Sequence, residues 1–293
     1  MRRLVINADD FGLTDGVNRA IAEAHQQGIV TSTTLMANSR ALVGAVALAQ
    51  KLPRLSVGCH VVLVDGQPVL SADRVGSLVG AGSEQKFPAS FGSFAKSALR
   101  KKFDTREIEA EVAAQIARIQ QAGLTVTHLD SHKHVHMLPQ VCAPIIRAAR
   151  ACGIRAIRNP FVPVKPLAFA HLARRPKLWT RYGETKVLRG YHREFRQRVV
   201  DAGMVTTDGS FGVVSTGALD ADLFRAIVGS IPDGTWEFVC HPGYVDDDLA
   251  KIHTRLRESR EKELLVLTSE DARRVLAQNG IELISYADLT ANQ

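Results

Sequence analysis

Runs of β-branched and apolar residues alternate along most of the chain with segments in which apolar residues recur at helical spacing. The clearest amphipathic helix covers residues 106–123, where Ile108, Val112, Ile116 and Ile119 fall on one face. Most predicted helices end at a glycine or a proline, as helices commonly do. The pattern predicts strands at about 3–9, 31–38, 56–64, 125–131, 156–161, 211–215, 235–243 and 281–289, and further helices at about 15–28, 40–53, 139–153, 219–229 and 269–280.

This strand and helix order predicts an α/β fold of the TIM-barrel-like (β/α) barrel type, either complete or distorted and incompletely closed. A doubly wound sheet is the alternative, but the first strand-to-helix turn, NADDFGLTDG, lacks the G-x-G-x-x-G phosphate-binding pattern. We expect a single barrel domain over residues 1–293. Two insertions interrupt it, an irregular Gly- and Ser-rich stretch at about 65–103 and a mostly helical one at about 163–205.

The composition is that of an ordinary globular protein, with 45% hydrophobic and 23% charged residues. The formal charge of +7 is unevenly distributed: residues 147–198 carry 14 Lys and Arg against Glu184 and Glu194, which leaves −5 for the rest. A charge confined to one segment predicts a local anionic surface as partner and argues against nucleic acid.

The four cysteines form no C-x-x-C pair, so they predict neither a disulfide scaffold nor a cysteine zinc site. The apolar run after Arg2 and Arg3 is too short for a secretion signal, and no apolar stretch is long enough to span a membrane. We therefore expect a cytoplasmic protein.

Residues 128–137, HLDSHKHVHM, concentrate four of the ten histidines and one aspartate. His128, Asp130, His132, His134 and His136 occupy alternate positions, which a strand would direct to one face. A helix would instead pair residues four apart, and a solvated polar loop is the third alternative. The β-branched residues before the cluster and Pro139 after it favour the end of a strand.

Titratable residues also fall where other predicted strands end. Asp9 and Asp10 end the first strand, His60 lies in the third, Arg158 and Asn159 follow the fifth, and His241 ends the seventh. The carboxyl ends of parallel strands meet at the reactive face of such a fold. A carboxylate with two imidazoles suits zinc or a similar divalent ion and leaves positions open for water and substrate. These residues together predict a catalytic metal site.

The joint pattern resembles the YdjC-like carbohydrate deacetylases. The resemblance rests on NADDFGLTDGVNRAI, GIVTSTTLMAN, VGCHVVL, THLDSHKHVHMLP, WEFVCHPG, SREKEL and IELISYADL, which lie in order over most of the chain. It is weakest at 65–103 and 163–205. Within the family, the chain looks more similar to the hopanoid-biosynthesis-associated deacetylases than to the chitooligosaccharide deacetylases.

The resemblance implies a divalent-metal-dependent hydrolase that removes an N-acetyl group from an amino sugar, with one zinc or magnesium ion as cofactor. It implies Asp10, His60 and His132 as metal ligands, Asp9 as the general base and His241 as the acid that protonates the leaving amine. Lys133 departs from related sequences, which often have another histidine there. The resemblance also implies a substrate-binding set consisting of Phe11, Asp130, His134, His136 and Arg158.

The expected substrate is the N-acetylglucosaminyl headgroup of a hopanoid lipid. In 163–189, apolar Leu167, Phe169, Leu172, Leu178 and Trp179 are mixed with basic Arg174, Arg175, Lys177 and Arg181. Such a mixture predicts peripheral contact with an anionic membrane surface at the inner face of the cytoplasmic membrane, with a solvated helical excursion or a homodimer contact as alternatives. Alternative functions are deacetylation of soluble chitooligosaccharides such as chitobiose, another metal-dependent hydrolase (phosphoesterase or amidohydrolase), and a non-enzymatic metal-binding membrane scaffold.

Overall fold

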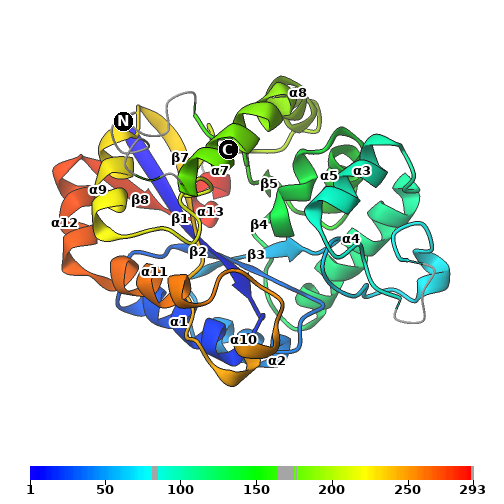
Figure 1. The fold of residues 1–293 in the computed structure, drawn as a ribbon, viewed down its shortest axis with the longest axis horizontal. Coiled ribbons are helices and arrows are strands. Elements are labelled where there is room, and N and C mark those ends of the chain that lie inside the picture. Colours follow the sequence, from blue (N-terminus) through cyan, green and yellow to red (C-terminus); the bar gives the residue numbers. More distant parts are fainter. Residues whose placement is uncertain (81–84, 164–174, 176, 292–293) are drawn as a thin grey trace.

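The computed structural model describes residues 1–80, 85–163, 175 and 177–291. Figure 1 shows helices surrounding a central set of strands through which β1 runs. The strands are β1 (Arg2–Phe11), β2 (Ser32–Leu35), β3 (Ser56–Val61), β4 (His128–Ser131), β5 (Ala156–Ile157), β6 (Ser210–Phe211), β7 (Gly234–Cys240) and β8 (Ile281–Ile284). The helices are α1 (Asp15–Gln26), α2 (Leu42–Gln50), α3 (Phe91–Leu99), α4 (Thr105–Gln121), α5 (Pro139–Ala151), α7 (Lys177–Leu188), α8 (His192–Asp201), α9 (Ala221–Ser230), α10 (Asp247–Lys251), α11 (Glu258–Thr268), α12 (Glu270–Gln278) and α13 (Tyr286–Ala291), with short 3-10 turns at Ala72–Arg74, His132–Met137 and Arg189–Tyr191.

All eight strands lie in one parallel sheet, in the order β5-β4-β3-β2-β1-β7-β6, with β8 paired to the first half of β1. β1 is buried over almost its whole length, as expected for a strand covered on both faces. The outer strands β5 and β6 approach each other through irregular backbone contacts. Val205 forms a parallel bridge with Ala156, and Ser210 N donates to Phe161 O at 3.1 Å. The sheet therefore curls into a distorted barrel, which confirms the predicted fold class.

The helices form where the sequence supplies a cap and an apolar face. Asp104 accepts from the Arg106 backbone N–H at the start of α4, and the four isoleucine and valine positions predicted for its inner face are completely buried. In Figure 1, α3, α4 and α5 lie together beside β3 to β5, while α9 and α12 cover the other side of the sheet. This arrangement leaves the carboxyl ends of the strands as the place where polar side chains meet.

The amino-terminal end of the barrel is filled by α13. Tyr286 N donates to Ser32 Oγ at the start of β2, and Ala287 N donates to Ser56 Oγ at the start of β3. The Tyr286 ring stacks on His128 at 3.8 Å, and Gly58 is required beside it because a Cβ there would lie 2.6 Å from the His128 ring. The prediction of a strand over 281–289 is therefore wrong after Ile284, where the chain turns into this helix.

Two further helices differ from the prediction. The stretch 65–103 was expected to be irregular, yet α3 lies within it, with Ser90 as the N-cap that accepts from Ser93 N. The helix α11 was not predicted at all, because its buried face carries Arg260 and Glu263 as well as leucines. Of the two, α11 contributes residues to the site.

The described part of the 163–205 insertion is helical, as predicted, and consists of α7 and α8 joined by a 3-10 turn. Leu178 is buried in the core, Trp179 is 53% exposed, and Arg175 forms an ion pair with Asp220 at 2.7 Å. The predicted membrane-contacting residues Leu167, Phe169, Leu172 and Arg174 lie outside the described residues. Within the described part of the chain, no helix combines the length and the apolar character needed to cross a bilayer.

Candidate active site

Asp9 and Asp10 end β1 inside the barrel, and both are almost completely buried. The pairing of β1 with β2 changes register between Ala8 and Phe11, and Asp10 has φ of 69°. A left-handed backbone is rare for a non-glycine residue and is often found at functional sites. This irregularity breaks the alternation of a regular strand, so both carboxylates reach the same polar cluster.

Asp10, His60 and His132 bring three metal-ligand atoms together. The Asp10 carboxylate lies 3.5 Å from His60 Nε2 and 3.5 Å from His132 Nδ1, and all three donor atoms lie within 4.8 Å of one another. His60 is buried, whereas the His132 side chain is 22% exposed and lies toward solvent. The trio therefore has the composition of a catalytic zinc site, with three protein ligands and a side open to water.

Asp130 fixes the ring of His60. Its Oδ1 lies 2.7 Å from His60 Nδ1, and Thr34 of β2 donates to its Oδ2 at 3.1 Å. A proton held on Nδ1 by this carboxylate leaves the lone pair of Nε2 facing Asp10, which is the tautomer that a metal ligand needs. The observed contacts thus fit a bound cation in the composition and closeness of the donor atoms. Burial lowers the pKa of His60, but Asp130, Asp9 and Asp10 together outweigh it and raise that pKa to about 9. Without a cation the ring therefore holds a second proton on Nε2, and a cation that binds there would displace that proton.

Asp9, His60 and Asp130 form a second group with metal-ligand spacing, but it already holds a cation of the protein itself. Arg158 is completely buried and binds Asp9 through both carboxylate oxygens, at 2.6 and 2.8 Å. Its guanidinium also pairs with Asp130 and, at 2.7 Å, with Glu237. The guanidinium already neutralises Asp9 and Asp130, so the first group is the better candidate for a cation.

The Arg158 cluster keeps Asp9 ionised. Burial alone raises the pKa of Asp9, but the charge and hydrogen bonds of Arg158, with smaller effects of His60 and His241, hold it well below its usual range. Burial likewise raises the pKa of Glu237, and its carboxylate accepts from Tyr286 Oη at 2.7 Å.

The cluster as a whole has a deficit of positive charge. Among the described residues, the buried carboxylates of Asp9, Asp10, Asp130, Glu237 and Glu263 face two buried guanidinium groups, those of Arg158 and Arg260. Counted as ionised, five negative charges and two positive ones leave −3, or −2 while His60 is protonated. Buried charges are costly unless they are paired, so a divalent cation beside Asp10 would stabilise this arrangement.

His241 lies at the end of β7 on the wall next to Asp9. Its Nε2 is 3.8 Å from Asp9 Oδ2, and its backbone N–H donates to Glu263 Oε2 at 2.6 Å. Its Nδ1 is buried with no hydrogen-bond partner among the described residues and lies 4.0 Å from the same Glu263 oxygen. A small rotation of the ring would let Glu263 accept from Nδ1, so Glu263 is placed to orient this imidazole.

With this geometry established, the comparisons with known proteins identify the family. The profile described as YdjC-like protein matches residues 3–278. The chain belongs to the YdjC-like family. It is 35% identical to the carbohydrate deacetylase of Geobacillus stearothermophilus over 288 residues, covering 98% of both chains, and 31% identical to that of Brevibacillus brevis over 289 residues, covering 98% of this chain and 99% of the other. Its structure is similar to that of an Enterococcus faecalis V583 protein assigned provisionally to cellobiose-phosphate cleavage, with a TM-score of 0.78, 26% identity and 98% of both chains covered.

The histidine cluster of this YdjC-like chain does not form one face of one strand. The strand β4 ends at Ser131, and Lys133 and His134 adopt left-handed conformations with φ of 55° and 54°. His128, at the start of β4, lies deeper in the barrel, where it contacts Asn7 and the Tyr286 ring. The strand thus ends within the cluster, as the sequence favoured, and the five alternate positions do not share one face. Of the four histidines, His132 is the one in the metal-ligand trio found among the described residues.

His134 and His136 differ in what holds them. His136 is fully buried between Ser131 Oγ at 2.5 Å and the Arg158 carbonyl at 3.2 Å, and so supports the fold. His134 has a buried Nδ1 with no partner in the described part of the chain, and burial lowers its pKa to about 3, with Arg158 adding to the effect. Lys133 pairs with Asp65 at 2.7 Å, away from the trio.

Four of the predicted substrate-binding residues are fully buried in this family member, namely Phe11, Asp130, His136 and Arg158. Phe11 is fully buried in the apolar core, so it forms no accessible pocket wall. Arg158 and Asp130 are also fully buried, and their polar atoms are engaged with other buried groups of the cluster. The sequence alone does not show whether such a residue supports the site from inside the core or contacts a substrate.

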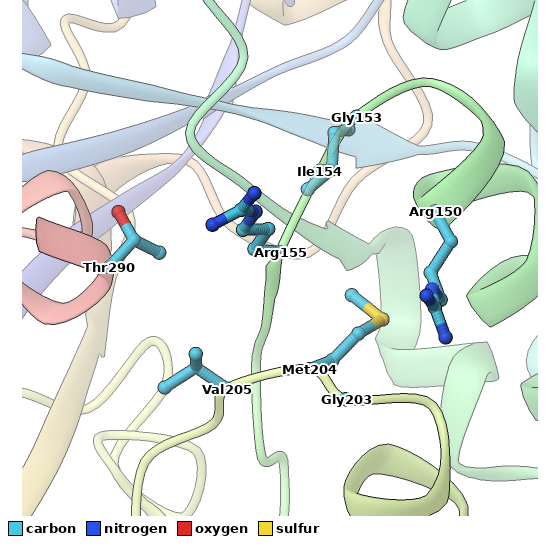
Figure 2. Close-up of a pocket in the computed structure, with 8 residues that line it drawn as sticks. All are labelled: Arg150, Gly153, Ile154, Arg155, Gly203, Met204, Val205 and Thr290. Carbon is cyan, nitrogen blue, oxygen red and sulfur yellow. The ribbon is translucent and has the colours of Figure 1, made fainter. Parts of the chain in front are cut away.

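Residues that the sequence analysis missed complete the site. Glu237 of β7, Thr34 of β2, and Arg260 and Glu263 of α11 all contact a predicted site residue. A cavity of about 470 Å³ lies elsewhere, before the start of β5, and Figure 2 shows its lining by Arg150, Arg155, Met204 and Thr290. No residue of the Asp10 cluster lines it, so we locate the active site by its chemistry and not by this cavity.

Proposed function

We propose that the chain is a carbohydrate deacetylase that removes an N-acetyl group from an N-acetylated amino sugar with the help of a divalent cation held by Asp10, His60 and His132. The observation that carries the proposal is the convergence of these three donor atoms, with His60 already oriented by Asp130. Full-length similarity to curated carbohydrate deacetylases supports the chemistry. Two imidazoles and one carboxylate favour zinc over magnesium, which prefers oxygen ligands.

A bound cation would lower the pKa of the attacking water and polarise the acetyl carbonyl. Asp9 is the proposed base. Arg158 and Asn7, whose Nδ2 donates to Asp9 Oδ1 at 3.0 Å, hold its carboxylate in place and in its ionised form. The same contacts make Asp9 a weak base, so it is suited to a water molecule whose own pKa is already lowered.

His241 is the proposed acid. Its Nε2 lies beside Asp9, and Glu263 holds its backbone and faces its Nδ1. Protonation of the sugar amine prevents the tetrahedral centre from returning to the amide, so a positioned imidazole at this point would let acetate and the free amino sugar separate.

The proposed substrate is the N-acetylglucosaminyl headgroup of a hopanoid lipid. The support is the concentration of basic residues in 147–198, apart from the buried Arg158, together with the exposed Trp179 on α7. Indole rings and basic side chains favour anionic membrane surfaces. His134, whose Nδ1 is buried and without a partner in the described chain, is the proposed contact to the sugar.

Acetate release tests these proposals. The purified protein, loaded with zinc or with magnesium, would be given an N-acetylglucosaminyl lipid in vesicles, chitobiose, and a phosphate ester. We expect acetate from the lipid and none of the other products. Acetate from chitobiose alone would replace the lipid substrate with a soluble oligosaccharide, and phosphate release would replace the deacetylase with a phosphoesterase. Sedimentation with anionic and with neutral liposomes at low salt tests membrane contact separately.

A further inference from the structure

Arg260 is a fully buried arginine that the helix α11 carries into the site. Its Nε donates to Leu256 O at 3.1 Å, and its aliphatic stem runs beneath the turn after β7. Gly243 is required in that turn because a Cβ there would lie 2.8 Å from Arg260 Cδ. The Gly243 backbone N–H in turn donates to Arg260 O at 3.3 Å. The side chain is thus held from several directions before it reaches Asp10.

The two oxygens of Asp10 have different partners. Arg260 Nη2 donates to Oδ2 at 2.6 Å, whereas Oδ1 lies 3.5 Å from each of His60 Nε2 and His132 Nδ1. Charge-assisted hydrogen bonds of this length are strong and directional. One oxygen of the carboxylate is therefore engaged by the guanidinium, and the other is left for the cation.

We propose that Arg260 is a positioning residue that limits Asp10 to one oxygen in cation binding and so keeps a coordination position open for the reaction. The proposal rests on the proposed function, because it concerns the same cation. It gives α11, which supplies none of the three ligands, a role in the reaction.

Removal of the Arg260 guanidinium should have opposite effects on cation affinity and on turnover. Without the guanidinium, Asp10 Oδ2 is free to turn to the cation, and a positive charge that repels the cation is gone. Both effects strengthen cation binding. A second carboxylate oxygen would occupy a position that water or the acetyl oxygen needs, so turnover would fall.

A purely structural role fits the contacts of Arg260 less well. Its Nη1 is buried with no hydrogen-bond partner among the described residues, although an unpaired buried donor usually costs about 1–3 kcal/mol. A side chain kept only for stability would be expected to satisfy this donor. Removal of a structural arginine would also disorder the trio and weaken cation binding, which is the reverse of the effect proposed here.

The test compares Arg260→Met, which removes the charge at similar length, with Arg260→Lys, which keeps it. Lys262→Met is the matched control, because Lys262 is an exposed cation on the same helix. Zinc affinity would be measured by titration calorimetry on each metal-free protein, and kcat and KM by acetate release. Circular dichroism would confirm folding, with Arg260→Gln as the substitute if the methionine variant does not fold.

We expect R260M to bind zinc about tenfold more tightly than the native chain, a change within the reach of one nearby charge. We expect its kcat to fall by at least about tenfold, with R260K close to native in zinc affinity and K262M native in both. Weaker zinc binding by folded R260M, or an unchanged kcat, would overturn the proposal. A native chain that binds no zinc would overturn the proposed cation site as well, so the two failures are distinguishable.

Discussion

Replacing Asp130 with asparagine should weaken the cation site without removing a ligand. The carboxylate of Asp130 serves two partners at once, His60 Nδ1 at 2.7 Å through Oδ1 and Arg158 through Oδ2. An asparagine amide has one acceptor and one donor group. It can therefore accept from either His60 or Arg158, but not from both.

Each orientation of that amide has a cost. If the oxygen faces His60, the amide N–H₂ group opposes the donors of Arg158 and of Thr34, whose hydroxyl lies 3.1 Å from Oδ2. If the amide turns, His60 must accept at Nδ1, and its proton moves to Nε2, where it points at the cation. Outer hydrogen-bond partners of metal-bound histidines typically contribute about 10–100-fold in metal affinity or activity, which is about 1.4–2.7 kcal/mol.

We therefore expect zinc affinity to fall by about 10–100-fold in Asp130→Asn, as measured by competition with a chelating dye. The control is Asp65→Asn, which makes the same chemical change in a partly exposed ion pair with Lys133. The control should keep native zinc affinity, since surface ion pairs contribute little. Native affinity in the Asp130 variant, with acetate release also unchanged, would refute the reasoning that His60 depends on this carboxylate.

Three further outcomes are expected. Glu263→Gln should lower kcat by about tenfold, which is part of the roughly 10²–10⁴-fold rate increase that a general acid contributes. Zinc affinity should stay native, and a loss of zinc would show that Glu263 acts on the ligands and not on His241. Tyr286→Phe removes the hydroxyl that donates to buried Glu237 and should lower the free energy of unfolding by about 1–3 kcal/mol in urea titrations without a change in zinc affinity. His134→Ala should raise KM for the acetylated sugar and leave zinc binding intact; an unchanged KM would remove His134 from the sugar site.

Hydrophobic patterning was sufficient to predict the barrel and the ends of its first strands. β1 reads as a buried run that ends in two aspartates, and β3 carries His60 within an equally apolar run. Because parallel strands present their carboxyl ends at one edge, the grouping of Asp10 with His60 followed from strand order alone.

The histidine cluster shows where such patterning stops being informative. Alternation predicts one face only while the strand continues, and β4 ends at Ser131. The left-handed Lys133 and His134 then change the direction of each following side chain, a feature that composition does not reveal. His128, two residues before Asp130, lies against Tyr286 at the amino-terminal end instead.

The helix α11 escaped prediction for a related reason. Its buried face includes Arg260 and Glu263, so the apolar periodicity that normally reveals a helix is missing. Charged residues such as these are buried because they pair with other polar groups, in this case Asp10 and His241. Those contacts are known only from the three-dimensional structure. Likewise, the sequence predicts Arg158 to be a pocket residue, because its neighbours along the chain do not indicate that three carboxylates surround it.

Zinc content and acetate release of His132→Ala, compared with His134→Ala, test the central claim most directly. The two histidines are two residues apart on the same turn, but only His132 places a ring nitrogen beside Asp10, at 3.5 Å. After loading and desalting, we expect about one zinc per chain in the native and His134 variants and essentially none in the His132 variant, which should also release no acetate. A His132 variant that retains its zinc and its activity would contradict the assignment of the site.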